Sequence, residues 1–239
     1  MPPTIVPALC SRCNGSGWIP LPGDHLRVEP CECQGDLRRH QRLASANIPK
    51  RYEHCSLDTF REETTVLKNA KRRVQEFVDL WPNVSEGKGL LFMGGCGVGK
   101  THLAVAALVE IIDSGKPGRV MFSNFQNLIQ EIQASFDADT ATTKAEIMRP
   151  ILEADLLVLD ELGSQKPTQF VHDILYYVIN TRYNEERATI FTTNYYDRSA
   201  DAKEETLDQR IGTRLRSRLF EMAQVIEFAG AKDHRRNTL

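Results

Sequence analysis

Short runs of consecutive apolar residues recur along the chain from residue 89 onward. One of them, Leu156-Leu157-Val158-Leu159, is apolar at every position, which is typical of a parallel strand covered on both faces. The runs predict five β-strands, at Gly89–Met93, Arg119–Ser123, Leu156–Asp160, Thr189–Thr193 and Gln224–Phe228.

The segments between these runs have the mixed apolar and polar pattern of amphipathic helices. Strands that alternate with helices indicate βαβ units, so we predict a three-layer α/β fold around a parallel five-stranded sheet. The predicted helices are Lys100–Asp113, Phe125–Phe136, Thr143–Glu153, Thr168–Glu186 and Leu207–Met222.

The first 47 residues have a different composition. They are rich in Gly, Pro, Cys and Arg and show little periodicity before residues 36–46. A chain of 239 residues suits one main domain with a small appendage. We therefore predict a Cys-rich module with a basic linker at 1–47 and an α/β domain at 48–239.

Composition and charge exclude several classes of protein. The hydrophobic content of 41% and charged content of 26% are ordinary for a globular protein, and the net charge is -2. There is no apolar run of the roughly 20 residues that a membrane helix needs, and no secretory signal pattern at the start. We expect a cytoplasmic protein without a membrane anchor.

Basic residues gather in two places despite the slightly acidic total. Such clusters can hold the phosphates of nucleic acid, but they are also common on solvated helix faces, and the sequence leaves both interpretations open. The clusters are Arg38, Arg39, His40 and Arg42 before the main domain, and Arg210, Arg214, Arg216 and Arg218 near the end.

A phosphate-binding loop follows the first predicted strand of the sheet. Gly94-x-x-x-x-Gly99-Lys100-Thr101 matches the P-loop pattern and opens a predicted helix, as that pattern requires. Glycines let backbone N–H groups converge on an anion at the helix N-terminus. Lys100 is suited to the β- and γ-phosphates and Thr101 to Mg²⁺. We expect ATP to be held by Gly94, Gly95, Cys96, Gly97, Val98, Gly99, Lys100, Thr101 and His102, with Cys96 a filler without chemistry of its own.

Two carboxylates follow a buried strand about sixty residues later. At this distance from a P-loop, Asp160 is expected to hold Mg²⁺ through water and Glu161 to polarise the water that attacks ATP. An asparagine also ends a predicted strand. Asn194 could orient that water or contact the γ-phosphate, although asparagine often simply ends a strand.

These motifs together resemble the AAA+ ATPases of the DnaC/IstB type, which include bacterial helicase loaders and transposition helpers. The resemblance covers roughly residues 48–239 and rests on the P-loop, on Leu159-Asp160-Glu161 and on four further segments. These segments are Ile48-Pro49-Lys50-Arg51-Tyr52 leading to Phe60, Arg182-Tyr183, Thr192-Thr193-Asn194 and Arg210-x-x-x-Arg214-x-x-x-Arg218-Leu219. The resemblance implies an AAA+ core of the ASCE class without a C-terminal lid domain.

The resemblance also implies roles for single residues. It makes Asn194 the sensor-1 residue, Arg235 the sensor-2 residue and Arg218 the arginine finger that reaches a neighbouring subunit's γ-phosphate. Hydrolysis would then depend on assembly into a homo-oligomer. Arg214 is the alternative finger, and pairing of both arginines with acidic neighbours is the structural alternative. The family places the segment from Tyr52 to Phe60 near the adenine. AAA+ proteins often have a polar residue that restrains the catalytic glutamate at the position of Asn124, so the resemblance implies that Asn124 restrains Glu161; the alternative is an asparagine that simply ends a strand.

Four of the six cysteines lie within residues 10–33, which in a cytosolic chain favours a metal over disulfides. Cys10, Cys13, Cys31 and Cys33 could supply four thiolates to a structural Zn²⁺. The spacer between Cys31 and Cys33 is a single residue, so His25 or His40 could replace one cysteine.

Three functions remain open. The first is a DnaC-like loader that binds a replicative helicase through its N-terminal module, which resembles a partner-binding unit, and single-stranded DNA through its core. The second is an IstB-like, ATP-dependent helper of a transposase. The third is a zinc-stabilised DNA-binding module with a structural nucleotide, which Glu161 and Arg218 disfavour. ATP and Mg²⁺ are expected in all of these.

Overall fold

A parallel sheet forms the centre of the molecule. The structure, a computed structural model, describes residues 10–14, 16–21, 24–137, 142–198, 204–231 and 233–234, with residues 24–26 described by their backbone alone. The five predicted strands are confirmed, with bounds that differ by at most one residue, and their order in the sheet is β4-β5-β6-β3-β7. They are β3 (Gly89–Met93), β4 (Val120–Asn124), β5 (Leu156–Asp160), β6 (Ala188–Thr193) and β7 (Ala223–Glu227).

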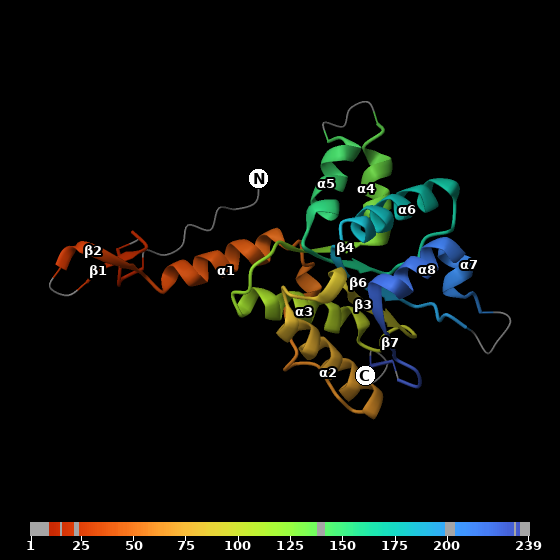
Figure 1. Cartoon of the computed structure of the whole chain (residues 1–239), viewed down its shortest axis with the longest axis horizontal. Helices are drawn as coiled ribbons and strands as arrows, with labels where there is room; N and C mark the ends of the chain where they lie inside the picture. The colour runs from red at the N-terminus through yellow and green to blue at the C-terminus, as the bar shows by residue number, and fades with distance from the viewer. Residues whose placement is uncertain are drawn as a thin grey trace.

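Helices cover both faces of this sheet, which confirms the predicted three-layer α/β fold (Figure 1). Alternate residues of each strand face opposite layers, so Leu90 and Phe92 pack with one helical layer while Leu91 and Met93 pack with the other. The first layer contains α2 (Thr65–Leu80) and α3 (Lys100–Asp113). The second contains α4 (Phe125–Ala134), α5 (Lys144–Glu153), α6 (Gln169–Asn184), α7 (Leu207–Ile211) and α8 (Thr213–Met222).

Two helices differ from the prediction. Helix α2 was not expected, yet Leu67, Ala70 and Val74 are buried on one face of it and the Thr64 hydroxyl accepts from the Leu67 N–H at its start. The helix predicted over 207–222 is broken into α7 and α8 at Gly212, whose φ of 82° lies outside the helical region.

The N-terminal part is a β-hairpin followed by a helix. Strand β1 (Trp18–Leu21) pairs antiparallel with β2 (Asp24–Pro30), and α1 (Cys33–Ser45) leads from the hairpin to the core. Figure 1 shows α1 projecting from the core with the hairpin at its far end. Near the core, Arg39 pairs with Asp113 at the end of α3, with N···O distances of 2.6 and 3.0 Å.

The segment after α1 lies along the outer edge of the sheet. Ala46 is fully buried, and its carbonyl accepts from the N–H of Phe122 in the edge strand β4 at 2.7 Å. The Asn47 amide donates to the Phe122 carbonyl at 3.4 Å. Backbone groups of β4 that face away from β5 are thereby paired. Two 3₁₀ turns follow, at Lys50–Tyr52 and Ser85–Gly87.

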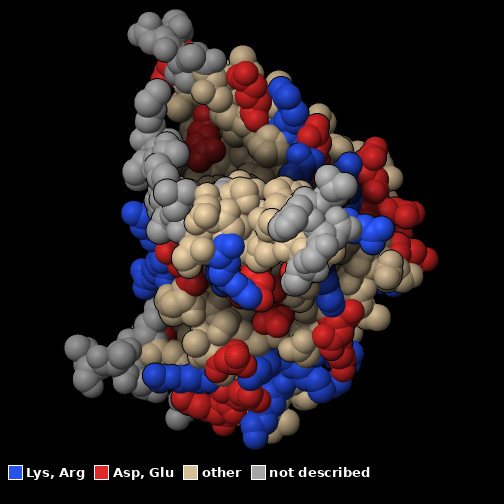
Figure 2. All heavy atoms as spheres, turned by 90° about the vertical axis from the view of Figure 1, so that its left-hand side faces the viewer, with Lys and Arg blue, Asp and Glu red and all other residues tan. Residues whose placement is uncertain are grey.

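Charges are mixed on the face of the molecule seen along α1. Figure 2 shows basic and acidic side chains interspersed over the lower part of this face, where α2 lies. Arg72 and Arg73 of α2 both pair with Glu76. Among the described helices, none combines the length and apolar character needed to cross a bilayer.

Candidate nucleotide-binding site

The predicted P-loop connects β3 to α3 at the carboxyl edge of the sheet. Gly97 and Gly99 have φ values of 74° and 100°, which favour glycine. A Cβ on Gly99 would lie 2.7 Å from the Phe60 ring, so the loop also needs glycine there for space. The sequence thus folds this loop into the curled form that presents backbone N–H groups to an anion.

Lys100 is held inside this loop. Its side chain is buried, and Nζ donates to the carbonyl oxygens of Gly94 and Gly95 at 2.6 Å each. Nζ also donates to Asn194 Oδ1 at 2.8 Å. Asn194 follows β6, which pairs with β3, so the sheet brings the predicted sensor residue to the P-loop lysine.

Asp160 ends β5 and lies next to the start of α3. Its Oδ1 accepts hydrogen bonds from the hydroxyls of Thr101 at 2.8 Å and Thr192 at 2.6 Å, and only 2% of the residue is exposed. Burial raises the pKa of Asp160, and the two hydroxyl donors partly offset this rise. A carboxylate beside a threonine hydroxyl is an oxygen donor set that suits Mg²⁺.

Glu161 has an unusual backbone. Its φ is 59°, in the left-handed region that non-glycine residues rarely adopt. Its side chain Oε2 accepts from Asn124 Nδ2 at 3.0 Å, while Asn124 Oδ1 caps α4 by accepting from the N–H groups of Gln126 and Asn127. Asn124 therefore both starts a helix and contacts the predicted catalytic carboxylate.

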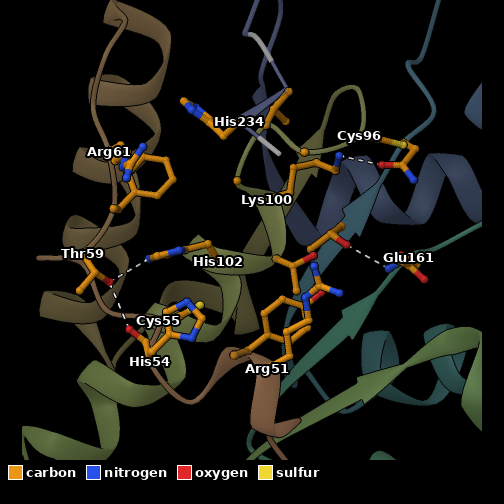
Figure 3. A pocket seen from close by; sticks show the side chains of 18 residues that line it. Arg51, His54, Cys55, Thr59, Arg61, Cys96, Lys100, His102, Glu161 and His234 are labelled. Atoms are coloured by element: carbon orange, nitrogen blue, oxygen red, sulfur yellow. Dashed lines mark hydrogen bonds between the residues drawn. The ribbon is translucent and has the colours of Figure 1, made fainter. Parts of the chain in front are cut away.

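A cavity of about 520 Å³ lies at this edge of the sheet, and Lys100, Glu161 and Asn194 are among the residues that line it. Figure 3 shows Lys100 and Cys96 on one side of it and the segment that carries His54, Thr59 and Arg61 on the other. The cavity has room for a nucleotide. Its lining includes Arg51, Tyr52, His54, Cys55, Thr59, Phe60, Arg61, Cys96, Gly97, Val98, Gly99, Lys100, Thr101, His102, Glu161, Thr192, Asn194 and His234.

His102 joins α3 to the wall opposite the P-loop. Its Nε2 lies 2.9 Å from the Ser56 carbonyl oxygen and 3.3 Å from Thr59 Oγ1. The Phe60 ring packs against the imidazole with centroids 5.4 Å apart. Burial lowers the pKa of His102. Because the Ser56 carbonyl oxygen can only accept a hydrogen bond, Nε2 is the donor in this contact.

The segment after β7 also reaches the P-loop. The His234 N–H donates to the Gly97 carbonyl at 3.2 Å, and a Cβ on Gly97 would lie 1.7 Å from Asp233 Oδ1. The predicted sensor-2 residue, Arg235, lies outside the described residues.

Arg218 is not among the residues that line the cavity. Its guanidinium lies over the Tyr176 and Tyr183 rings, 5.0 and 5.7 Å from their centroids, and its Nη1 is buried without a hydrogen bond. Within the described part of the chain, neither Arg218 nor Arg214 forms an ion pair. α8 thus holds Arg218 against α6, and Arg218 is outside the set of residues that line the cavity with Lys100.

Several residues of the two basic clusters have structural partners. Arg42 donates to the Gly118 carbonyl, and Arg210 donates to the carbonyls of Gly163, Ser164 and Gln165. Arg216 forms a two-pronged pair with Asp197. These contacts tie α1, α7 and α8 to their neighbours.

The four N-terminal cysteines converge as predicted, with all four sulfur atoms within 4.8 Å of one another. The Cys10–Cys31 and Cys13–Cys33 sulfur distances are 3.7 and 3.5 Å. A tetrahedral site with Zn–S bonds of about 2.3 Å has sulfur atoms about 3.8 Å apart, so the cluster fits Zn²⁺. The Gly17 N–H donates to Cys13 Sγ at 3.3 Å.

Of the two histidines that could have replaced a cysteine at this site, only His40 has a described side chain. His40 lies on α1 and does not belong to the cluster among the described side chains. The side chain of His25 lies outside the described part of the structure.

The lining also includes polar residues to which the sequence analysis gave no role at the site, among them Arg51, Thr192 and Arg61. Arg51 and Arg61 flank the segment that the family resemblance places near adenine, and this position was their only signal. Thr192 had a clearer one, because it precedes Asn194 on a strand that runs to the same edge as Asp160.

The chain is similar in sequence to two kinds of bacterial protein, replicative helicase loaders and an insertion sequence ATP-binding protein. It is 25% identical to the replicative helicase loader DnaC of Escherichia coli K12 over 196 residues, 81% of this chain and 77% of that protein. It is 26% identical to DnaC of Buchnera aphidicola from Acyrthosiphon pisum, covering 66% of this chain and 63% of that one. It is 27% identical to a putative insertion sequence ATP-binding protein of Sinorhizobium fredii, covering 80% of this chain and 61% of the relative. The chain thus spans about three fifths to three quarters of these relatives.

Solved structures give the same fold. A crystal structure of the DnaC helicase loader superposes with a TM-score of 0.64 at 33% identity, covering 75% of this chain and 99% of the other. A DnaI structure superposes with a TM-score of 0.62 at 22% identity, covering 79% and 95%. The sequence profile described as "IstB-like ATP binding protein" matches residues 32–238. With that profile spanning most of the chain and a P-loop inside it, the protein belongs to the family of IstB-like ATP-binding proteins, which are AAA+ proteins with a P-loop.

Proposed function

We propose that the protein hydrolyses ATP and that this hydrolysis controls the loading of a replicative helicase onto DNA. The observation that supports hydrolysis best is the position of Glu161 at the cavity that also contains Lys100 and Thr101. A protein that only binds ATP needs the lysine and the loop, whereas a carboxylate beside the phosphate site is what activation of water requires.

Each residue has a distinct role in this proposal. Backbone N–H groups of the P-loop and Lys100 bind the phosphates, and Asn194 and Lys100 orient one another. Thr101 and Asp160 hold Mg²⁺, which supplies positive charge that stabilises the phosphoryl transition state. Glu161 takes the proton of the attacking water. The contact with Asn124 holds the Glu161 carboxylate away from the phosphates until that contact opens.

Hydrolysis is tested with the wild type, Glu161→Gln and Lys100→Ala, with and without single-stranded DNA. We expect Glu161→Gln to bind ATP with nearly unchanged affinity and to lose hydrolysis by about 10²-fold or more, because general-base catalysis contributes that much. Lys100→Ala should lose ATP binding. A wild type that binds no ATP, or that binds but never hydrolyses it, would contradict the proposal.

The arginine finger is the second part of the proposal. We assign the arginine finger to Arg218, which the family resemblance supports, and Arg214 is the alternative. A cation at the γ-phosphate of a neighbouring subunit would make hydrolysis depend on assembly. Arg218→Ala should therefore lower hydrolysis in the assembled protein while leaving ATP binding unchanged, and Arg214→Ala is the matched control. Equal rates for Arg218→Ala and the wild type would contradict this assignment, and loss only in Arg214→Ala would transfer the role.

The partner is proposed as a replicative helicase because the DnaC relatives are helicase loaders. The alternative partner is a transposase, which the insertion sequence relative and the family profile favour. Co-purification with the helicase or the transposase encoded in the same genome distinguishes the two. ATP binding without hydrolysis in the presence of either partner would instead favour the third alternative, a DNA-binding module with a structural nucleotide.

Single-stranded DNA is proposed as a further ligand. Binding would be electrostatic, so its affinity should fall steeply with salt. Fluorescence anisotropy of a labelled oligonucleotide at several salt concentrations, with ATP or with ADP, measures this directly. Affinity that is insensitive to nucleotide and to salt would contradict an ATP-controlled contact.

Zn²⁺ is proposed as the ion of the cysteine cluster, with a structural role. The hairpin has too small a core to be stable alone, and a metal held by four thiolates would order it. Metal analysis of the purified protein should give one zinc per chain, and Cys13→Ser should lose it. Removal of the ion should unfold the hairpin and leave ATP binding intact.

A further inference from the structure

Thr192 lies beside the two acidic residues of the site because of the strand register. Leu159 of β5 pairs with Phe191 of β6, and the next residues along both parallel strands are Asp160 and Thr192. Thr192 is 1% exposed, so its hydroxyl must find partners inside the protein.

The hydroxyl has two partners, and they are consecutive residues. It donates to Asp160 Oδ1 at 2.6 Å and accepts from the Glu161 N–H at 2.9 Å. One oxygen thus holds the side chain of the proposed magnesium ligand and the backbone of the proposed base. Both the donor and an acceptor site of the hydroxyl are used.

The backbone of Glu161 needs such support. Its left-handed φ of 59° is unfavourable for a residue with a Cβ, by about 1–2 kcal/mol. The Thr192 carbonyl also accepts from the Leu162 N–H at 2.8 Å, so Thr192 binds two successive N–H groups of the turn after β5. This turn sets the direction in which the Glu161 side chain leaves the sheet.

We propose that Thr192 is a positioning residue for ATP hydrolysis, which fixes the Asp160 carboxylate and the Glu161 backbone relative to one another. This inference rests on the proposed ATPase function. Thr192 acts through these two residues, and the P-loop binds the nucleotide phosphates without it. Its loss should therefore affect turnover and Mg²⁺ dependence more than ATP affinity.

The test compares Thr192→Val, which keeps the shape and removes the hydroxyl, with Thr192→Ser, which keeps the hydroxyl. We expect Thr192→Val to lower kcat by about 10–100-fold, to raise the Mg²⁺ concentration needed for half-maximal rate, and to change ATP affinity by less than about threefold. Thr192→Ser should stay within about threefold of the wild type in all three quantities. Thr189→Val is the matched control, because Thr189 is a buried, hydrogen-bonded threonine of the same strand, and it should keep the wild-type kcat.

Several results would overturn the inference. It fails if Thr192→Val keeps the wild-type kcat, or if Thr192→Ser loses as much as Thr192→Val. If Thr192→Val does not fold, Thr192→Ser and Thr192→Ala replace it, since they differ only in the hydroxyl, and equal rates would refute the proposal.

Failure of the proposed ATPase function gives a different result. In that case the wild type binds ATP without hydrolysing it, and the Mg²⁺ dependence of ATP binding becomes the readout. Thr192→Val should then lose the increase in affinity that Mg²⁺ gives the wild type, and Thr192→Ser should keep it. Equal Mg²⁺ dependence in both variants would refute the role of Thr192 as well.

Discussion

Single residues of the P-loop are constrained by different neighbours. Gly97 has a left-handed φ, and a Cβ at this position would collide with Asp233. A Cβ on Gly95, in contrast, would meet no atom within 4 Å. We expect Gly97→Ala to lower the free energy of unfolding of the nucleotide-free protein by about 1–2 kcal/mol or more, because alanine is strained at this φ. Gly95→Ala should change it by less than about 0.5 kcal/mol. Urea unfolding without nucleotide measures both, and equal values would contradict the strain expected for alanine at this φ.

The buried carboxylate of Asp160 is expected to oppose stability and serve function. Burial raises its pKa, so the ionised form present at neutral pH is disfavoured by folding. Asp160→Asn keeps an oxygen that can accept from Thr101 and Thr192 and removes the charge. We expect a higher Tm without nucleotide, together with loss of the Mg²⁺-dependent hydrolysis.

The pH dependence of this effect has a definite sign. The folded state holds the proton more tightly than the unfolded state, so the unfavourable contribution of the Asp160 carboxylate is complete above its folded pKa and is lost as the pH falls through that pKa toward the unfolded value. Asp160→Asn should lack this contribution. The difference in unfolding free energy between the two proteins should therefore be largest near neutral pH and shrink on acidification. A constant difference across pH would contradict the assignment.

At the scale of elements, most of the strands and helices could be predicted from the sequence. Strand β5 was predictable because all its side chains are buried, which requires an apolar run, and the P-loop marked the junction of β3 and α3. The break at Gly212 was not predicted, because apolar residues continue with helical spacing on both sides of it. Helix α2 had the signals of a helix but lies outside the pattern of alternating strands and helices on which the prediction was based.

The site was predictable to the extent that its residues belong to local motifs. Lys100, Asp160 and Glu161 are each marked by the segment around them. The role of Thr192 depends on β6 lying next to β5, and the strand order is set by the packing of the whole sheet. The contact of His102 with Ser56 likewise joins residues 46 positions apart.

Helix α2 provides a local test of the element that was missed. The Thr64 hydroxyl caps it by accepting from the Leu67 N–H at 3.3 Å. Thr64→Ala should lower the free energy of unfolding by about 1 kcal/mol, which is typical for loss of an N-cap. The exposed neighbour Thr65, replaced by alanine, is the matched control and should change it much less. Equal effects in thermal or urea unfolding would argue against the cap.

For the whole molecule, α1 sets the distance between the cysteine cluster and the core. Thirteen helical residues span about 20 Å, so a partner bound at the hairpin lies well away from the nucleotide cavity. The described contacts of α1 with the core are close to its C-terminal half, where Arg39 meets Asp113. The hairpin can therefore hold a partner without closing the entrance to the cavity.

The segment after α1 has a further consequence, for solubility. The predicted boundary between residues 47 and 48 would remove Ala46 and Asn47, which pair with Phe122 of the edge strand β4. An open, apolar strand edge is a template for pairing with another chain. We expect a protein that starts at Ile48 to aggregate with rising concentration in light scattering, and one that starts at Cys33 to remain monodisperse without nucleotide. Identical scattering from both would contradict this expectation. We expect the residues that lead to the hairpin to protect the sheet from self-association as well, so a truncation meant to isolate the nucleotide-binding domain should retain them.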